Sequence, residues 1–233
     1  MQDEVTKHTK KIYKTVKDKE HSFAEKVKEI IVEICIIVFA VTLSIWLHSW
    51  SEQRHERHEA VEFLKGLKKD LNADINTIGE NKKTILLLDS NYAFLQKIEV
   101  GKVQKDDSIN HRLRFNLIVT RPNIGRYEGF KSSGKIGTIE NDALKQTILE
   151  YYQQTIPDIN YGENYVNNNQ NHIIDLRIDK PDNISLSNFI ASTKMKTLLQ
   201  LNKYNFEVNI YHYDNAIKQA KKIIAEIDED VKE

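Results

Sequence analysis

The sequence predicts a mainly α-helical protein: a single transmembrane helix near the N-terminus continues into a stalk, then into an extracytoplasmic bundle with a C-terminal heptad helix. Three observations support this fold class. Residues 30–50 are almost wholly apolar, and apolar residues recur every three or four positions through most of the remaining chain. Only three Pro and eight Gly occur among 233 residues, which disfavours sandwiches and barrels because these need many turns.

The apolar stretch at residues 30–50 reads IIVEICIIVFAVTLSIWLHSW and contains one carboxylate, Glu33. At about 1.5 Å per residue it is long enough to cross a hydrocarbon core of about 30 Å. Trp46 and Trp50 stand at its C-terminal end, where we expect them at the membrane interface. The stretch is longer than the roughly 7–15 apolar residues of a cleaved signal peptide, and no small-residue cleavage site follows it. We therefore expect a retained signal anchor.

Flanking charge predicts the orientation of the anchor. Seven Lys precede it in residues 10–29, and five Lys or Arg follow it in residues 51–70. The positive-inside rule then places residues 1–29 in the cytoplasm as a short basic tail. Residues 51–233 become the extracytoplasmic domain, on the periplasmic side of a bacterial inner membrane. The single Cys35 excludes an intrachain disulfide.

A stalk helix is expected at residues 51–99, where apolar positions are mostly three, four or seven apart. No Pro interrupts this stretch, so it can continue the membrane helix. Gly66 and Gly79 weaken the helix locally and are candidate bends, and Gly101 is expected to end it.

The bundle is expected at residues 104–201, with its helices separated by three prolines. Gly134 in a left-handed conformation should end one short helix. A short strand is an alternative for the HIIDLRI stretch near the end of the last helix. The prolines are Pro122, Pro157 and Pro181, and the expected helices run from Asp107 or Ser108 to about Val119, from 126 to 133, from Asn141 to about Gln154, and from 159 to 178.

The C-terminal helix, expected at residues 204–231, shows the most regular pattern. Its apolar positions are separated alternately by four and three residues over nearly four heptads, as in the seam of a coiled coil or bundle helix. The predicted packing seam consists of Phe206, Ile210, Tyr213, Ile217, Ala220, Ile224, Ile227 and Val231.

Motifs for chemistry are weak. The stretch Gly129–Lys135, GFKSSGK, matches part of a phosphate-binding loop, but Ile136 stands where the loop needs a hydroxyl for Mg²⁺. The RHERHE cluster at residues 54–59 lacks the zinc-protease spacing and is better explained as a solvated helix. We expect no catalytic residue, no cofactor and no metal site, hence no enzyme. Lys+Arg and Asp+Glu balance at 34 each, which gives no signal for nucleic acid.

Glu33 is the candidate functional residue within the membrane, because a carboxylate in hydrocarbon is costly. It lies only four residues into the span, so it can also reach the headgroups, and both a positional role and a contact with a partner helix or proton handling stay open. A second candidate is an arginine cluster, either an anion or lipid-headgroup patch or a salt-bridged bundle surface. Its members are Arg112, Arg114, Arg121 and Arg126.

Two segments resemble a bacterial family of uncharacterised single-pass membrane proteins that carry a domain of unknown function. The family anchor has the form G-E-I-x-L-V…W-N-E-x-R, matched here by Glu33, Trp50, Glu52 and Arg54, and the leucine pattern that follows it is matched by Leu64, Leu67, Asp70 and Leu71. The second family segment, Y-x-x-L-x-S-S-G, is matched within Tyr127–Tyr152. Val32 and Ala40 stand where the family has glycine. The resemblance covers about residues 30–175 and implies an inner-membrane protein with an extracytoplasmic domain, without a known activity.

These observations favour a membrane-anchored, non-enzymatic interaction or scaffold protein of the bacterial envelope. Its expected partners are the lipid bilayer and either a second copy of the chain or another envelope protein, bound through the C-terminal seam. Two alternatives stay open. The first is a sensor-like helical module that works with a separate partner. The second is a proton-coupled subunit of an energy-transducing membrane complex, with Glu33 as the relay.

Overall fold

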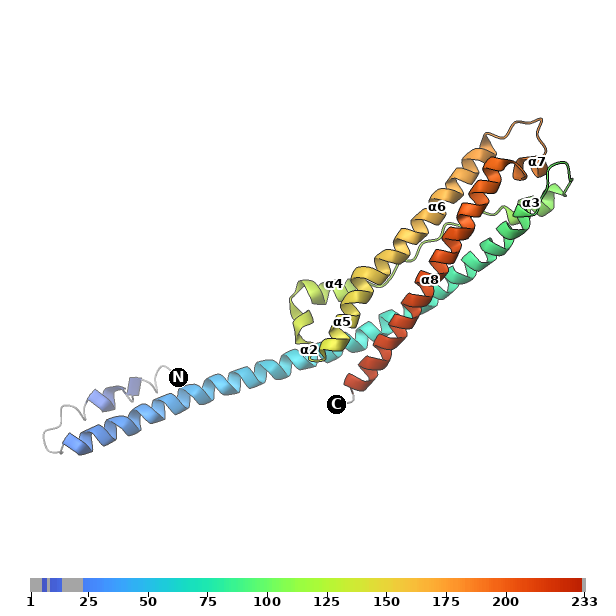
Figure 1. Cartoon of the computed structure of the whole chain (residues 1–233). Coiled ribbons are helices and arrows are strands. Elements are labelled where there is room, and N and C mark those ends of the chain that lie inside the picture. The colour runs from blue at the N-terminus through green and yellow to red at the C-terminus, as the bar shows by residue number, and fades with distance from the viewer. Residues whose placement is uncertain (1–5, 8, 14–22, 232–233) are drawn as a thin grey trace. The chain divides into compact units, whose positions relative to one another are not determined.

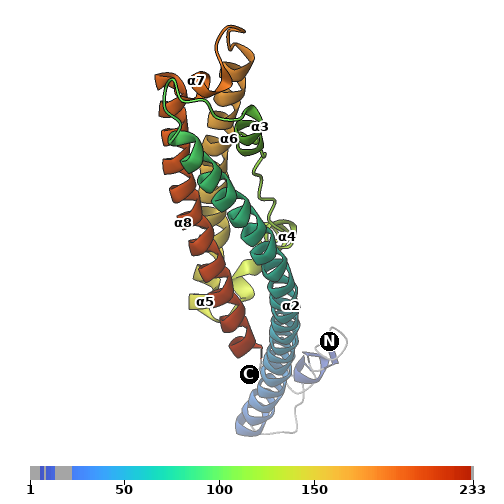
Figure 2. The same cartoon turned by 90° about the vertical axis from the view of Figure 1, so that its right-hand side faces the viewer.

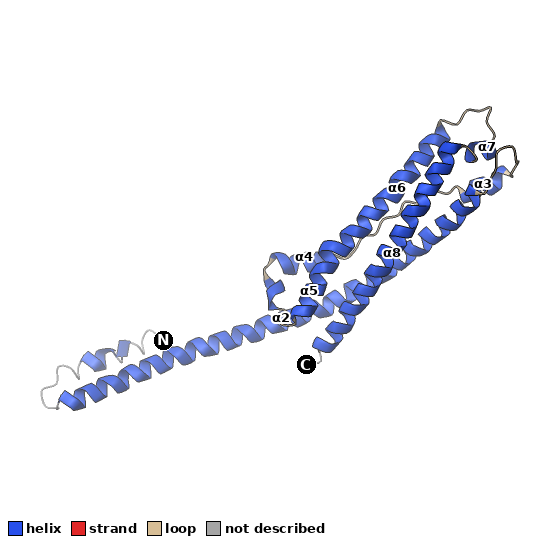
Figure 3. Cartoon of the chain, viewed as in Figure 1, coloured by secondary structure: helices blue, strands red, loops and turns tan. Residues whose placement is uncertain are grey.

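A computed structural model describes residues 6–7, 9–13 and 23–231. Every regular element in these residues is a helix, as Figure 3 shows, and this confirms the predicted fold class. The chain forms two compact units, Met1–Glu59 and Ala60–Glu233. One helix, α2 (Phe23–Gln96), begins in the first unit and continues into the second.

In the first unit, α2 contains the apolar stretch at residues 30–50, most of which is exposed. Its most apolar window has a mean hydropathy of 2.7, and only 6% of that window is buried. Trp46, Trp50 and most of the large apolar side chains between them and Ile31 are exposed. Among the described residues, this is the one helix long and apolar enough to cross a membrane.

In the second unit, α2 is a core helix. Leu64, Leu67, Leu71, Ile78 and Ile85 are all buried, and they recur at the three- and four-residue spacing of one helical face. Most of the stretch expected as a stalk therefore belongs to the bundle. The helix passes through both glycines that were candidate bends and ends at Gln96, before Gly101, whose φ of +80° places it in a turn.

Two further long helices, α6 (Ile156–Ile178) and α8 (Thr193–Asp230), lie beside this part of α2 and complete the bundle, as Figures 1 and 2 show. The rings of Tyr92 on α2 and Phe206 on α8 lie 5.4 Å apart in the core. At the far end, the ammonium of Lys196 donates hydrogen bonds to the carbonyls of Leu95, Gln96 and Ile98. A lysine from α8 thus caps the C-terminus of α2, which favours positive charge.

Short elements connect the long helices. Side chains cap three of the later helices, since Asn141, Ser185 and Ser192 each accept a hydrogen bond from a backbone N–H three residues on. Gly134 has a φ of +77°, as expected for the residue that ends the preceding helix. The elements are α3 (Asp106–Arg112), α4 (Gly125–Ser132), the 3₁₀ turn η1 (Lys135–Thr138), α5 (Asp142–Glu150), the π-helical turn η2 (Tyr151–Thr155) and α7 (Leu186–Ile190).

Pro157 does not separate two helices as predicted. The elements α5, η2 and α6 follow one another without a break, and Pro157 lies in the first turn of α6. Proline has no N–H to donate to the preceding turn, and the wider π-helical turn immediately before it absorbs this loss. The HIIDLRI stretch is part of α6, so the alternative of a strand there is wrong.

The heptad positions of α8 lie within the bundle. Phe206, Tyr213, Ala220 and Ile227 are buried, and Ile210, Ile217, Ile224 and Val231 are partly buried against the same core. α8 itself begins earlier than expected, at Thr193. The second fully buried row of α8 lies one position earlier than predicted, at Asn209, Ala216 and Ile223.

The second half of one predicted helix is replaced by extended backbone. The helix expected to reach Val119 ends at Arg112, and residues 114–124 have no helical turn. These residues are called the extended segment below. Figure 2 shows it as a thin trace that leads from α3 to α4 along the bundle.

Candidate functional site

The extended segment is held by a row of polar side chains from α6. The amide of Gln170 accepts from the N–H of Asn116 (3.0 Å) and donates to its carbonyl (3.1 Å). The amide of Asn167 does the same for Ile118, at 3.0 and 2.7 Å. Each side-chain amide thus replaces the peptide group that a neighbouring β-strand would supply. We call this arrangement, with Glu163 at its other end, the polar ladder.

Glu163 forms the third rung. Its carboxylate accepts from the backbone N–H of Thr120 at 2.8 Å and from the Thr120 hydroxyl at 2.5 Å. It also accepts from the hydroxyl of Tyr213 on α8, at 2.6 Å. Asn81 on α2 donates to the Thr120 hydroxyl at 2.9 Å. The last rung therefore joins all three long helices to the extended segment.

The spacing of the ladder explains its residue types. Three alternate residues of an extended chain span about 13 Å. The helix residues 163, 167 and 170 span about 10.5 Å along the axis of α6. The two longer side chains, Gln170 and Glu163, stand at the ends and the shorter Asn167 stands in the middle. The outer side chains can therefore spread apart and make up the difference in length.

Burial governs the chemistry at the Glu163 rung. Glu163 and Thr120 are buried, and Tyr213 is fully buried. Burial raises the pKa of the Tyr213 phenol, and the neighbouring Glu163 carboxylate raises it further. Tyr213 thus stays protonated and continues to donate. The arrangement fixes structure, since all its polar groups already satisfy one another.

A second polar cluster fixes the C-terminal end of the extended segment. Asp74 on α2 is buried and accepts from the backbone N–H of Asn123 at 3.0 Å and from its side-chain amide at 2.7 Å. Burial raises the pKa of the Asp74 carboxyl, although the bonds from Asn123 oppose this rise. Burial likewise raises the pKa of Tyr151 and Tyr152, whose hydroxyls have no partner among the described residues.

Gly66 has a packing role in the same region. A Cβ at this position would lie 2.3 Å from the guanidinium carbon of Arg126. Its absence lets the Arg126 side chain cross α2 and donate to Asp70 at 2.8 Å. This glycine therefore permits the close approach of the Arg126 side chain to α2.

The predicted arginine cluster does not form one patch. Arg126 pairs with Asp70, and Arg112 lies over the ring of Phe94 at 4.0 Å. Arg114 is exposed and donates to His111 at 2.9 Å. Arg121 is also exposed and has no ion pair with any residue that the structure describes. Arg114 and Arg121, the two exposed arginines of this cluster without an ion pair to a described residue, thus stand at the two ends of the extended segment.

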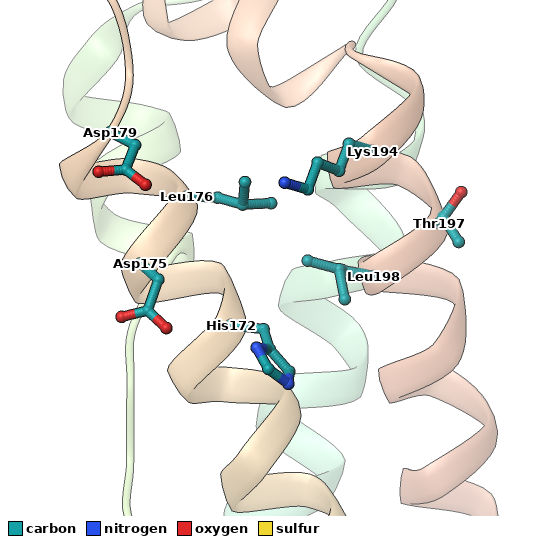
Figure 4. A pocket seen from close by; sticks show the side chains of 7 residues that line it. All are labelled: His172, Asp175, Leu176, Asp179, Lys194, Thr197 and Leu198. Atoms are coloured by element: carbon teal, nitrogen blue, oxygen red, sulfur yellow. The ribbon is translucent and has the colours of Figure 1, made fainter.

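A groove of about 360 Å³ lies between α6 and α8, lined by polar and apolar side chains. In Figure 4 the Lys194 ammonium reaches across the groove toward Leu176, whereas the carboxylates of Asp175 and Asp179 point away from α8. His172 lies lower on α6. Since the acidic side chains do not converge with His172 or Lys194, the groove offers no acid–base pair. The described residues contain no cluster of three or more potential metal ligands.

Glu33, the predicted intramembrane residue, is 4% exposed and lies within the first unit. Its carboxylate accepts from the ammonium of Lys11 at 3.1 Å. The carboxylate is thus paired with a cation of the basic N-terminal region. Trp46 and Trp50, the predicted interface residues, are exposed on α2.

Sequence reasoning missed the polar ladder. Its helical half was visible as polar residues at 163, 167 and 170, whose spacings of four and three place them on one face of α6. A polar stripe on a face that would otherwise be apolar indicates a polar partner inside the fold. The asparagine-rich run at residues 167–171 hid this stripe, because its other members are exposed or only partly buried.

The fold and its sites define a class: a helical bundle protein with one exposed apolar helix near its N-terminus. The model of a family of unknown function, DUF6090, matches residues 33–177, and the chain belongs to this family. The matched range contains both halves of the polar ladder and stops before α7 and α8. Searches of curated proteins and of solved structures found no match.

Proposed function

We propose that this protein is a non-enzymatic, single-pass membrane protein of the bacterial envelope that binds another protein through its extracytoplasmic helical domain. The observation that carries the proposal is the contrast within α2. Residues 30–50 leave most of their large apolar side chains exposed, whereas the same helix from Ala60 onward is a core helix of a bundle. A helix that exposes a long run of apolar side chains favours a lipid surrounding.

The composition of the bundle supports a binding role over catalysis. The buried groups of the polar ladder are engaged in fixing the extended segment, and the α6–α8 groove brings together no nucleophile and base. Loops and exposed segments fixed on a rigid scaffold commonly carry binding function. The extended segment fits this description.

The proposed topology can be tested with fusions and protease. A reporter fused after Glu233 should behave as extracytoplasmic, and protease added to spheroplasts should digest the chain beyond about residue 51. A C-terminal domain that is protected in sealed spheroplasts and digested after lysis would overturn the proposed orientation.

Purification in mild detergent tests the binding role and the two alternatives. We expect the full chain to retain a protein partner, and Glu33→Gln to leave this complex and the growth of a complemented deletion strain unchanged. Glu29→Gln, four residues earlier, is the control. Loss of the complex or of complementation with Glu33→Gln alone would favour a proton-coupled subunit, and co-purification of a signalling protein would favour a sensor-like module.

A further inference from the structure

The extended segment has one satisfied edge and one free edge. The N–H groups of residues 116, 118 and 120 all donate to the polar ladder. Within the part of the chain that the structure describes, the N–H groups of residues 115, 117, 119 and 121 donate to no protein atom. This alternation is the pattern of a β-strand that has a neighbour on one side only.

One face of the extended segment is exposed to solvent. Leu117 is 81% exposed and Val119 is 42% exposed, whereas Ile118 and Thr120 between and after them are buried. Backbone N–H groups that lack a protein partner are almost always in contact with water. The outward N–H groups are therefore accessible, and the exposed side chains beside them provide apolar contact area.

The sequence of this edge favours strand pairing. Residues 115–120 read FNLIVT, which contains no charge, no Gly and no Pro and is rich in residues preferred in strands. Natural proteins usually protect such an edge with charges or Pro on the strand, or cover it. Here Pro122 and the two arginines lie only at its ends.

The charges at the two ends indicate the chemistry of the missing strand. Arg114 and Arg121 are both exposed, and neither has an ion pair with a described residue. They are seven residues apart, about 23 Å along an extended chain. A strand with carboxylates near its two ends and uncharged β-forming residues between them would complement both the edge and its flanks.

We propose that residues 115–121 bind an extended peptide segment of a partner protein by strand addition, and that this segment carries acidic residues near both of its ends. The inference rests on the proposed binding function and names its surface. The polar ladder holds the receiving strand extended before the partner arrives, so binding does not have to order it.

The test uses the full chain in detergent micelles and three labelled synthetic peptides. The first has the sequence Glu-Val-Thr-Val-Thr-Val-Thr-Glu, whose two Glu are also seven residues apart. The second has Lys at both ends, and the third has Pro in place of the middle Val. Fluorescence anisotropy gives the affinities, and hydrogen exchange reports on the Leu117 and Val119 amides. We expect the acidic-ended peptide to bind most tightly and to slow exchange at these amides.

A matched pair of substitutions separates backbone bonding from side-chain contact. Val119→Pro removes an outward N–H and spares every N–H of the ladder, and Val119→Ala keeps the N–H. We expect a loss of at least about tenfold with Pro and of less than about threefold with Ala. Circular dichroism melting shows that both variants are folded. Arg114→Glu with Arg121→Glu should reverse the preference to the Lys-ended peptide, and this charge reversal leaves the core untouched.

Four outcomes would overturn the proposal. The first is no binding of the acidic-ended peptide up to about 1 mM, and the second is equal affinity with Val119→Pro and Val119→Ala. The third is a dimer of the wild-type chain that Val119→Pro converts to a monomer, which would assign the edge to a second copy. The fourth is a detergent complex that survives Val119→Pro. In that case the proposed function stands, but residues 115–121 are not the surface that binds the partner.

Discussion

The two sides of α6 contact their neighbours in different ways. Toward α8 the helix presents Gly162, where an added Cβ would lie 2.7 Å from the Asn209 side chain, so the two backbones lie close together. Toward the extended segment it presents Glu163, Asn167 and Gln170, which bond to backbone groups. The first side excludes water by close contact, and the second satisfies polar groups that burial would otherwise leave unpaired.

The difference matters because extended backbone can join a helical core only if its N–H and C=O groups have partners. A helix satisfies its own backbone groups and needs only apolar contact. A lone strand needs donors and acceptors from its neighbour, and α6 supplies them from side chains. The energetic roles of the two sides should therefore differ in mutants.

The largest effect is expected on the apolar side. Phe206→Ala should lower the free energy of unfolding by about 3–5 kcal/mol, because it removes a fully buried ring and leaves a cavity. Denaturant unfolding of the full chain in micelles measures it. Tyr211→Ala is the control on the same helix, since Tyr211 is 68% exposed. Similar losses for both residues would show that α8 does not pack as described.

On the polar side, Glu163→Ala should cost about 2–4 kcal/mol, because the N–H and hydroxyl of Thr120 and the hydroxyl of Tyr213 lose a buried acceptor. Glu163→Gln keeps the shape and one acceptor oxygen and should cost less. The same unfolding experiment applies. A Glu163→Ala variant as stable as wild type would mean that the ladder contributes nothing to the fold.

The middle rung should have a smaller effect. Asn167→Ala leaves the N–H and C=O of Ile118 unpaired and should cost about 1–2 kcal/mol. Asn168→Ala changes the same residue type at the next, exposed position and should be neutral or slightly stabilising, because Ala favours helix. Hydrogen exchange at Ile118 should accelerate only in the Asn167 variant; faster exchange in both would contradict a specific rung.

The smallest effect concerns Asp74. Burial raises its pKa in the folded state, so the folded protein holds this proton more tightly than the unfolded chain. The contribution of Asp74 to stability therefore falls as pH rises from its ordinary value of 3.8 through the raised pKa. The free energy of unfolding of the Asp74→Asn variant should lack this pH dependence. It should therefore rise relative to that of the wild type as pH increases over that interval. A constant difference between pH 4 and pH 7 would show that burial does not perturb this carboxyl.

The elements that rest on apolar contacts were largely predictable from the sequence. The long apolar helix follows from composition, and the buried row Phe206, Tyr213, Ala220 and Ile227 of α8 follows from its seven-residue recurrence. Local chemistry also predicted the left-handed Gly134 and the helix start at Asn141. In each case the signal and the structure lie in the same stretch of chain.

The extended segment and its polar ladder were not predictable in the same way. Residues 109–119 carry apolar side chains at spacings that a helix also satisfies, and the β-branched residues Ile118 and Val119 were the one local signal against it. Their extended conformation depends on side chains about fifty positions later in the chain. A tertiary partner thus overrides local preference, and periodicity alone cannot reveal it.

The polar ladder also restricts how the chain can change in length. Each amide of α6 bonds both groups of one residue, and a shift by one position would turn those groups toward the opposite edge. An inserted or deleted residue between Asn116 and Thr120 would therefore break the register at every rung beyond it. Length changes in the connection between α2 and α3, at residues 97–105, leave this register intact. Relatives that share the ladder should accordingly vary in length at this connection and keep a constant length within the extended segment.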